Sequence, residues 1–177
     1  RILITGGAGF IGYNSAVYFK KKKHQVYVID NLSRKGVERN FKDLKSKKIY
    51  TFKCNILNFK KLFKLIKKIK PTVILHQAGQ VTVTKSIKNP RFDLDTNIVG
   101  TFNMLEAVKL LKLKCIFIYP STNKVYGDLK KLKITEKKNK YSFLYSKSVD
   151  EKQPIDFHSP YGCSKGSAEQ YVLDYSR

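Results

Sequence analysis

The sequence predicts an α/β domain built on a doubly wound parallel sheet. Short apolar segments alternate with segments of helical periodicity along most of the 177 residues. Three of the apolar segments, 2–5, 72–76 and 115–119, contain hardly any polar residue, which is typical of parallel strands covered by helices on both faces. A glycine cluster, Gly6 to Gly12, directly follows the first of them. Together these features indicate the Rossmann fold.

The alternation assigns each element in turn. The expected strands are 2–5, 25–30, 49–54, 72–76 and 115–119. The expected helices are 10–19, about 58–69, about 92–111 and one that begins near Ser159. Right-handed crossovers between parallel strands place a binding crevice at the carboxyl ends of the strands.

One segment breaks this rhythm. Residues 128–158 separate the fifth strand from the last helix and show no clear periodicity. Loops of this length are unusual inside a compact domain, so we expect a functional lid or a small insertion. A tolerated surface excursion is the alternative.

Composition narrows the class of partner. The formal net charge is +23, and clustered basic residues are one mark of nucleic-acid binding. All but five of the 36 basic residues are lysines, however, whereas arginine is the usual reader of base edges. The lysines are spread along the chain and fall mostly on polar helix faces, as in 60–68. We therefore expect no specific nucleic-acid partner.

Other features suggest a cytoplasmic protein without membrane contact. No apolar run approaches the roughly 18 residues that a bilayer span needs, and no secretory signal opens the sequence. The three cysteines and three histidines show no metal or redox spacing, so no metal is expected and a reduced compartment is indicated. Arg1 lies directly against the first strand and the last helical pattern stops without a cap, so we expect a fragment of a longer chain.

The glycine cluster is a candidate phosphate-binding loop. Gly6, Gly9 and Gly12 lie between a strand and a helix, where glycine permits a tight turn and a close approach to a pyrophosphate. The free amides of Phe10 and Ile11 at the helix N-terminus would receive the negative charge.

Asp30 ends the second strand, 18 residues after Gly12. A carboxylate at this place accepts the hydroxyls of an adenosine ribose and repels a 2′-phosphate. It therefore favours NAD over NADP, although the nearby Arg34 could hold a 2′-phosphate.

The last helix carries a candidate redox site. Ser159 can cap it, and Pro160 suits its first turn. Tyr161 and Lys165 are four residues apart, on one helix face. A phenol has an ordinary pKa of about 10, and an ammonium beside it favours the phenolate that could take a proton from a sugar hydroxyl. Thr122, after the fifth strand, could bond the same substrate oxygen.

These residues together resemble the extended short-chain dehydrogenase/reductase superfamily, which includes nucleotide-sugar epimerases and dehydratases. The resemblance covers essentially the whole chain. It implies NAD as cofactor and a catalytic set of Thr122, Tyr161 and Lys165. It implies cofactor contacts from Gly6, Gly9, Phe10, Ile11, Gly12, Asp30, Asn31, Ser33, Arg34, Asn55, Ile56, Ala78, Gly79, Gln80, Asn97, Tyr161 and Lys165. Asn55 replaces the usual Asp, which weakens one adenine contact.

Four longer segments, 29–36, 78–81, 121–128 and 156–166, look like those of epimerases that act at C2 of a CDP-linked dideoxyhexose. This resemblance implies an NAD-dependent isomerase that oxidises C2 transiently and returns hydride to the opposite face. The product would enter O-antigen lipopolysaccharide or other surface-glycan synthesis.

Two alternatives remain. The superfamily's 4,6-dehydratases carry Asp-Glu after the catalytic Thr, where this chain has Asn123 and Lys124, so dehydration is disfavoured. A UDP-hexose 4-epimerase needs the same three catalytic residues and is the main alternative. A non-catalytic NAD-binding module is the alternative of another class.

The superfamily also implies what surrounds this domain. Segments after the Tyr/Lys helix supply the rest of its sheet and most of its nucleotide-sugar pocket. We therefore expect 1–177 to be the NAD-binding domain without its C-terminal substrate part, and unable to turn over substrate alone. The helix of Tyr161 and the 92–111 helix are expected to form a homodimer interface, as in many relatives.

Overall fold

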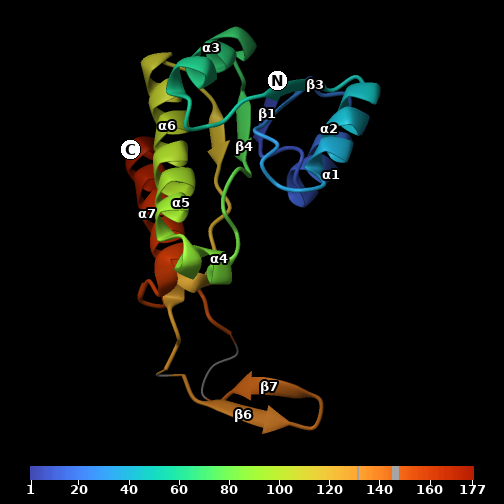
Figure 1. Ribbon diagram of the computed structural model, residues 1–177. Coiled ribbons are helices and arrows are strands. Elements are labelled where there is room, and N and C mark those ends of the chain that lie inside the picture. The colour runs from blue at the N-terminus through green and yellow to red at the C-terminus, as the bar shows by residue number, and fades with distance from the viewer. Residues whose placement is uncertain (131, 145–147) are drawn as a thin grey trace.

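The structure, a computed structural model, describes residues 1–130, 132–144 and 148–177. Its main sheet has five parallel strands in the order β3-β2-β1-β4-β5 (Figure 1). The strands are β1 (Ile2–Thr5), β2 (Val26–Asp30), β3 (Tyr50–Lys53), β4 (Val73–His76) and β5 (Ile116–Ile118). This arrangement confirms the predicted doubly wound parallel sheet.

Alternate side chains of the central strand point to opposite sides, and helices cover both of its faces. The edge strand β5, which was expected to be covered in the same way, leaves Ile116 63% and Ile118 45% exposed. Ile2 and Ile4 of β1 lie in a core that α1 (Phe10–Lys21) and α2 (Val37–Ser46) close. Leu3 faces the other core, against α3 (Phe59–Ile69) and α6 (Gly100–Leu110). All four residues of β1 are buried, as a strand covered on both faces requires.

Helix α2 was missing from the sequence prediction. The segment is strongly charged, and only Val37, Phe41 and Leu44 are buried in it. Their spacing of four and three residues is a helical stripe, but one too sparse to stand out from the charged residues around it.

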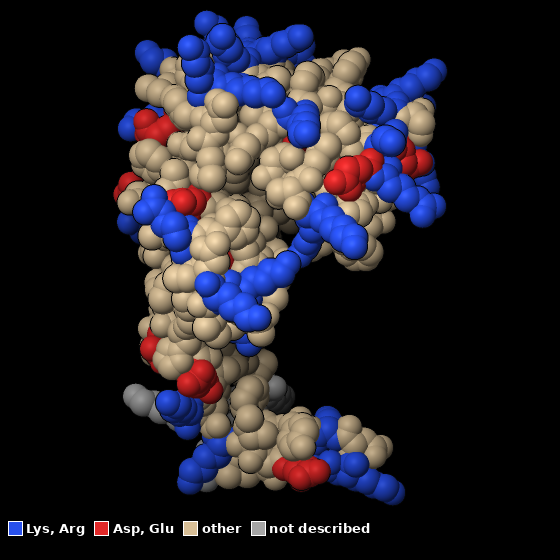
Figure 2. Space-filling model, in the orientation of Figure 1, with Lys and Arg blue, Asp and Glu red and all other residues tan. Residues whose placement is uncertain are grey.

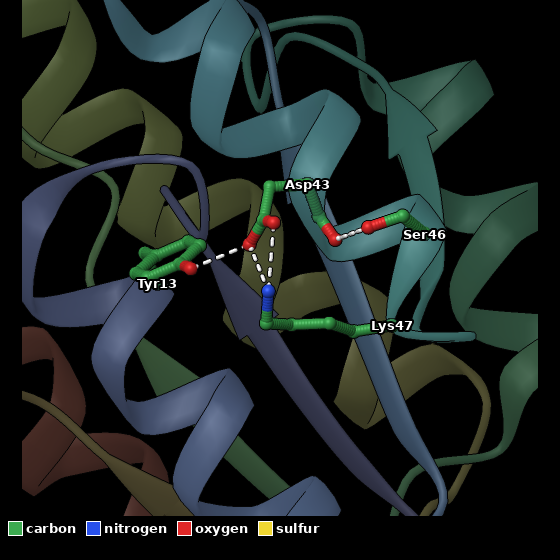
Figure 3. A network of polar contacts seen from close by, with 4 residues as sticks. All are labelled: Tyr13, Asp43, Ser46 and Lys47. Carbon is green, nitrogen blue, oxygen red and sulfur yellow. Dashed lines mark hydrogen bonds and ion pairs between the residues drawn. The ribbon is translucent and has the colours of Figure 1, made fainter.

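A polar network joins α2 to α1 (Figure 3). The Tyr13 hydroxyl of α1 donates to a carboxylate oxygen of Asp43 on α2. The Lys47 ammonium lies 2.7 Å from both oxygens of the same carboxylate. The Ser46 hydroxyl donates to the main-chain oxygen of Asp43 at the end of the helix. The carboxylate thus links the two helices that cover one face of the sheet.

The prediction of one regular helix over 92–111 was wrong. It consists of α5 (Pro90–Asp93), a π-helical segment η1 (Leu94–Val99) and α6. The wider turns of η1 turn the buried Asn97 toward the protein interior. A further short helix, α4 (Val83–Lys88), also lay outside the prediction.

The segment 128–158 contains a structure that its sequence did not predict. Strands β6 (Ile134–Lys137) and β7 (Lys140–Phe143) form an antiparallel hairpin, which extends away from the sheet (Figure 1). A short 3₁₀ helix, η2 (Asn123–Tyr126), precedes it and α7 (Ser159–Ser176) follows. Residues 131 and 145–147 of the expected lid or insertion lie outside the described residues.

Within the described ranges, no helix has the length and apolarity that a membrane span needs. The same residues contain no group of three or more His, Cys, Asp or Glu side chains placed to hold a metal ion. Cys54, Cys115 and Cys163 are free thiols.

We expect the packing of α3 against the sheet to contribute to stability. Leu62 of α3 is fully buried, so Leu62→Ala should lower the free energy of unfolding by about 2–5 kcal/mol through lost transfer energy and a residual cavity. Urea denaturation followed by circular dichroism measures this change. Lys64→Ala, exposed on the same helix, is the control and should change it by about 0.5 kcal/mol or less. Equal effects of the two substitutions would contradict the packing described here.

Candidate functional site

The glycine loop between β1 and α1 packs too closely against the main chain to hold larger residues. Gly6 has φ +62°, and a Cβ on it would lie 2.7 Å from the amide nitrogen of Ala78. A Cβ on Gly12 would lie 2.5 Å from the main-chain oxygen of Gly6. Gly12 therefore allows the start of α1 to lie directly against the loop itself.

Helix α1 begins at Phe10, with Gly9 as an N-cap that supplies no side-chain acceptor. Its first-turn amides therefore have no intrahelical partner. Phe10 and Ile11 are 81% and 60% exposed, so this helix end is open on the outside. An anion can reach the free amides, which the positive end of the helix dipole also favours.

The carboxylate of Asp30 is fixed at the end of β2. Its Oδ2 accepts from the amide of Ala8 at 3.0 Å, and its Oδ1 accepts from the amide of Leu32 at 2.8 Å. Each oxygen keeps a second acceptor site. Asp30 therefore holds the glycine loop and can still receive two hydroxyl groups.

Other predicted cofactor residues fall into exposed and buried sets. Asn31 accepts from the amide and the hydroxyl of Ser33, and both residues are exposed, as is Arg34. Asn55 is exposed, whereas Ile56 is 5% exposed and packs in the core with α3 and α6.

The residues after β4 belong to a buried polar cluster. The Gln80 carboxamide donates to Asp93 and to the main chain of Thr82. The Asn97 side chain bonds the main chain of Gln80 and donates to the hydroxyl of Ser164 at 2.9 Å. The amide groups of both predicted cofactor residues thus make hydrogen bonds inside the protein and join the end of β4 to α7. In the same loop, Ala78 donates from its amide to Thr5, and Gly79 lies against Asn97.

Ser164 completes this cluster by donating to Asp93 at 3.1 Å. Neither residue was predicted from the sequence. A serine and an aspartate 71 positions apart carry no shared local pattern, and only the packing of α5 against α7 brings them together.

Helix α7 places the predicted catalytic pair. The helix begins at Ser159, whose φ is +63°. The Ser159 hydroxyl accepts from the amide of Gly162, as an N-capping side chain does. Tyr161 is half-buried, and Lys165, one turn later, is 8% exposed.

The loop with Thr122 lies against the first turn of α7. A Cβ on Gly162 would lie 2.9 Å from the main-chain oxygen of Lys124, so the glycine permits this close approach. Thr122 is half-buried and caps η2, because its hydroxyl accepts from the amide of Lys124. The predicted residues Thr122 and Tyr161 are therefore on adjoining turns.

Lys165 points back toward the end of β5. Its Nζ donates to the main-chain oxygen of Pro120 at 2.7 Å and lies 3.9 Å from the centre of the Tyr119 ring. Burial lowers the pKa of Lys165 to about 8, and the charge of Glu169 partly opposes this. The ammonium form still predominates at neutral pH.

Beneath Tyr119, His76 closes a chain of hydrogen bonds across the sheet. Thr5 Oγ1 accepts from the amide of Ala78 and forms a hydrogen bond with His76 Nδ1 at 2.8 Å. The Thr101 hydroxyl donates to Asn97 O, so it must accept from His76 Nε2 at 3.1 Å. A neutral ring with its proton on Nε2 fits both contacts, because Nδ1 can then accept from the Thr5 hydroxyl. Accordingly, burial and the Lys165 charge lower the pKa of His76 to about 3.

A separate cavity of about 880 Å³ lies between α6, β5 and α7. Phe102, Phe117 and Tyr171 are among its lining residues, and none of the predicted catalytic residues is. The predicted catalytic residues therefore lie outside this cavity.

The neutral His76 makes stability depend on pH. Its pKa is about 3 in the folded chain against 6.5 for an ordinary histidine, so its contribution is complete above pH 6.5 and decreases as the pH falls. Between pH 6.5 and 5, His76→Gln should reduce the slope of unfolding free energy against pH by up to about 1.4 kcal/mol per pH unit. Urea denaturation at several pH values tests this. His24→Gln, at an exposed position, is the control, and an unchanged slope in His76→Gln would contradict the assignment.

Comparison with known proteins places this arrangement in a family. The family model described as GDP-mannose 4,6 dehydratase matches residues 3–177. The CDP-paratose 2-epimerase of Salmonella typhi is 46% identical over 179 aligned positions, which cover 100% of this chain and 53% of the relative. A putative UDP-glucose 4-epimerase of Methanocaldococcus jannaschii is 33% identical and is covered to 51%. The chain spans about half the length of the curated relatives that it matches.

Solved structures agree on the fold. The UDP-Glc/GlcNAc 4-epimerase from Campylobacter jejuni superimposes with a TM-score of 0.83 at 30% identity, covering 99% of this chain and 48% of that one. The Thermus thermophilus UDP-glucose 4-epimerase in complex with NAD gives 0.82 at 28% identity, covering 99% and 50%. Since the family model matches nearly every residue and the fold agrees, the chain belongs to the GDP-mannose 4,6 dehydratase family.

Proposed function

We propose that this chain is the NAD-binding part of an NAD-dependent nucleotide-sugar epimerase. The observation that carries the proposal is the position of Tyr161 and the buried Lys165 on one turn of α7, beside the loop that presents Thr122. Epimerisation by transient oxidation needs a proton acceptor, a nearby cation and a hydrogen bond to the reacting oxygen. These three residues have the chemistry for each task.

The residues at the strand ends fit NAD. The Gly6 to Gly12 loop forms a tight turn that side chains at Gly6 and Gly12 would break, and the first-turn amides of α1 are free to bind a pyrophosphate. The open acceptor sites of Asp30 suit the two hydroxyls of an adenosine ribose. Structures of relatives with bound NAD support this choice. Bound NAD would supply a hydride acceptor and donor.

The chain's own residues would manage the proton. Tyr161 would take the proton of the sugar hydroxyl as the carbon is oxidised and return it when the carbonyl is reduced. The Lys165 ammonium would stabilise negative charge on the phenol oxygen. Thr122 would donate to the sugar oxygen and hold it in place. The main-chain bond from Lys124 fixes the Thr122 hydroxyl oxygen and leaves its proton free for this bond.

A CDP-linked dideoxyhexose, epimerised at C2, is the proposed substrate class. It is supported by the 46% identity to the CDP-paratose 2-epimerase. The family's name suggests dehydration instead, but Asn123 and Lys124 are exposed on η2 where dehydratases carry an acid/base pair. The 4-epimerase relatives keep epimerisation at C4 of a UDP-hexose as the second candidate. The CDP-sugar product would serve surface-glycan synthesis.

We also propose that the whole protein forms a homo-oligomer through α6 and α7. The two helices lie side by side (Figure 1), and Phe102 contacts Tyr171 and Tyr175 edge-on across them.

Basic side chains are spread over the visible face from α3 to the hairpin (Figure 2). This distribution gives no support to a defined nucleic-acid surface.

Cofactor binding is the first property to test. Gly12→Ala should weaken NAD binding about tenfold or more, because a Cβ 2.5 Å from Gly6 O forces the loop to move. Isothermal titration of the purified chain measures Kd, and mass spectrometry of the dinucleotide released on denaturation identifies it. Ser15→Ala, on the same helix, is the control. Unchanged affinity in Gly12→Ala would argue against this loop as the pyrophosphate site, and a folded parent chain that binds no NAD would sink the proposed function.

Catalysis is tested on a chimera that joins residues 1–177 to the remaining half of the Salmonella typhi relative. In this chimera, Tyr161→Phe should lower kcat for CDP-paratose about a hundredfold or more while NAD stays bound. Tyr171→Phe, on the same helix, should keep kcat. Residues 1–177 alone are expected to bind NAD without turnover. Full activity of the Tyr161→Phe chimera, or epimerisation by the 177 residues alone, would contradict these assignments.

A further inference from the structure

Lys165 has an unusual environment for a buried cation. Its side chain is almost completely covered, and in the described parts of the chain it forms no ion pair with a carboxylate. Glu169, one turn further along α7, hydrogen-bonds Ser121 instead. The ammonium meets one main-chain oxygen, that of Pro120, and the face of the Tyr119 ring. An ammonium within about 6 Å of a ring centre is attracted by the negative face of the ring.

Tyr119 itself is held on two sides. Its hydroxyl donates to the main-chain oxygen of Lys165 at 3.2 Å. Tyr119 therefore contacts both the main chain and the ammonium group of Lys165. Its ring stacks on His76, with centres 6.1 Å apart and planes inclined by 22°. The His76 ring is in turn fixed by Thr5 and Thr101. Contacts therefore run without a gap from β1 and β4 through Tyr119 to the Lys165 head group.

We propose that Tyr119 is a positioning residue: the face of its ring holds the Lys165 ammonium in place beside Tyr161. This inference rests on the proposed function of Lys165 and adds a residue to it. The ring offers the cation a partner that does not compete for protons. The Tyr119 phenol stays neutral, because burial raises its pKa well above the ordinary value. A carboxylate in its place would draw the ammonium into an ion pair and away from the phenol of Tyr161.

The ring also opposes the effect of burial on the lysine. Burial moves the pKa of Lys165 down to about 8, so the ammonium is lost as the pH rises through that value. Without the negative face of the ring, the charge would be lost at a lower pH. The lysine would then be partly neutral at pH 7, where its charge is needed to stabilise the phenolate.

The test replaces Tyr119 by rings of equal shape and different charge distribution. Tyr119→Phe removes only the hydroxyl, and a trifluorinated phenylalanine at the same position also weakens the negative face. Lysines labelled with ¹³C at Cε are titrated by NMR, and the Lys165 signal is the one missing from Lys165→Met. Tyr119→Phe should titrate as the parent does, whereas the fluorinated ring should lower the midpoint by about half a pH unit or more.

Equal midpoints for the two ring variants would overturn the proposal. A midpoint in Tyr119→Phe as low as in the fluorinated variant would also overturn it, because the hydroxyl bond would then be the cause. Both variants keep the volume of the ring, and thermal unfolding followed by circular dichroism confirms that each is folded. The titration needs neither NAD nor substrate. Failure of NAD binding would therefore sink the proposed function and leave this result to be judged separately.

Discussion

The central position of β1 is the constraint on which the rest of the structure depends. The strand is bonded to β2 on one side and β4 on the other, and both of its faces are buried. Its register sets Thr5 beside His76. The glycine loop can then leave β1 at the same edge where Asp30 ends β2. A shift of one residue would turn every side chain of β1 to the wrong core and separate these groups.

The parts of the site that were predictable are those encoded by short sequence segments. The glycine loop, its position between strand and helix, and the spacing of Tyr161 and Lys165 are local, and the structure has each in the expected element. Helix α2 and the β6–β7 hairpin were missed because charged residues hide their apolar spacing. Tyr119 and Asp93 were missed for another reason, since their roles depend on α7 packing back against distant segments.

The interior next to the strand ends is polar, and its side chains are joined by hydrogen bonds. Gln80, Asp93, Asn97 and Ser164 bond one another, while His76 joins Thr5 to Thr101. Buried polar networks of this kind are costly when one partner is lost. Because hydrogen bonds are directional, they define the position of α7 relative to the strand ends more narrowly than apolar contacts do. The half-buried Tyr161 therefore lies on a helix that these bonds hold in place, although α7 is far from β1 in sequence.

The π-helical segment η1 has a consequence for the length of the chain. It accommodates more residues per turn than the α-helices on either side. Deleting one residue there would favour a regular helix and rotate α6 by about 100° relative to α5. Met104 and Ala107 would leave the core while Asp93 stayed inside. The length of 94–99 is therefore a structural requirement of this chain, and segments grafted next to it should leave that length unchanged.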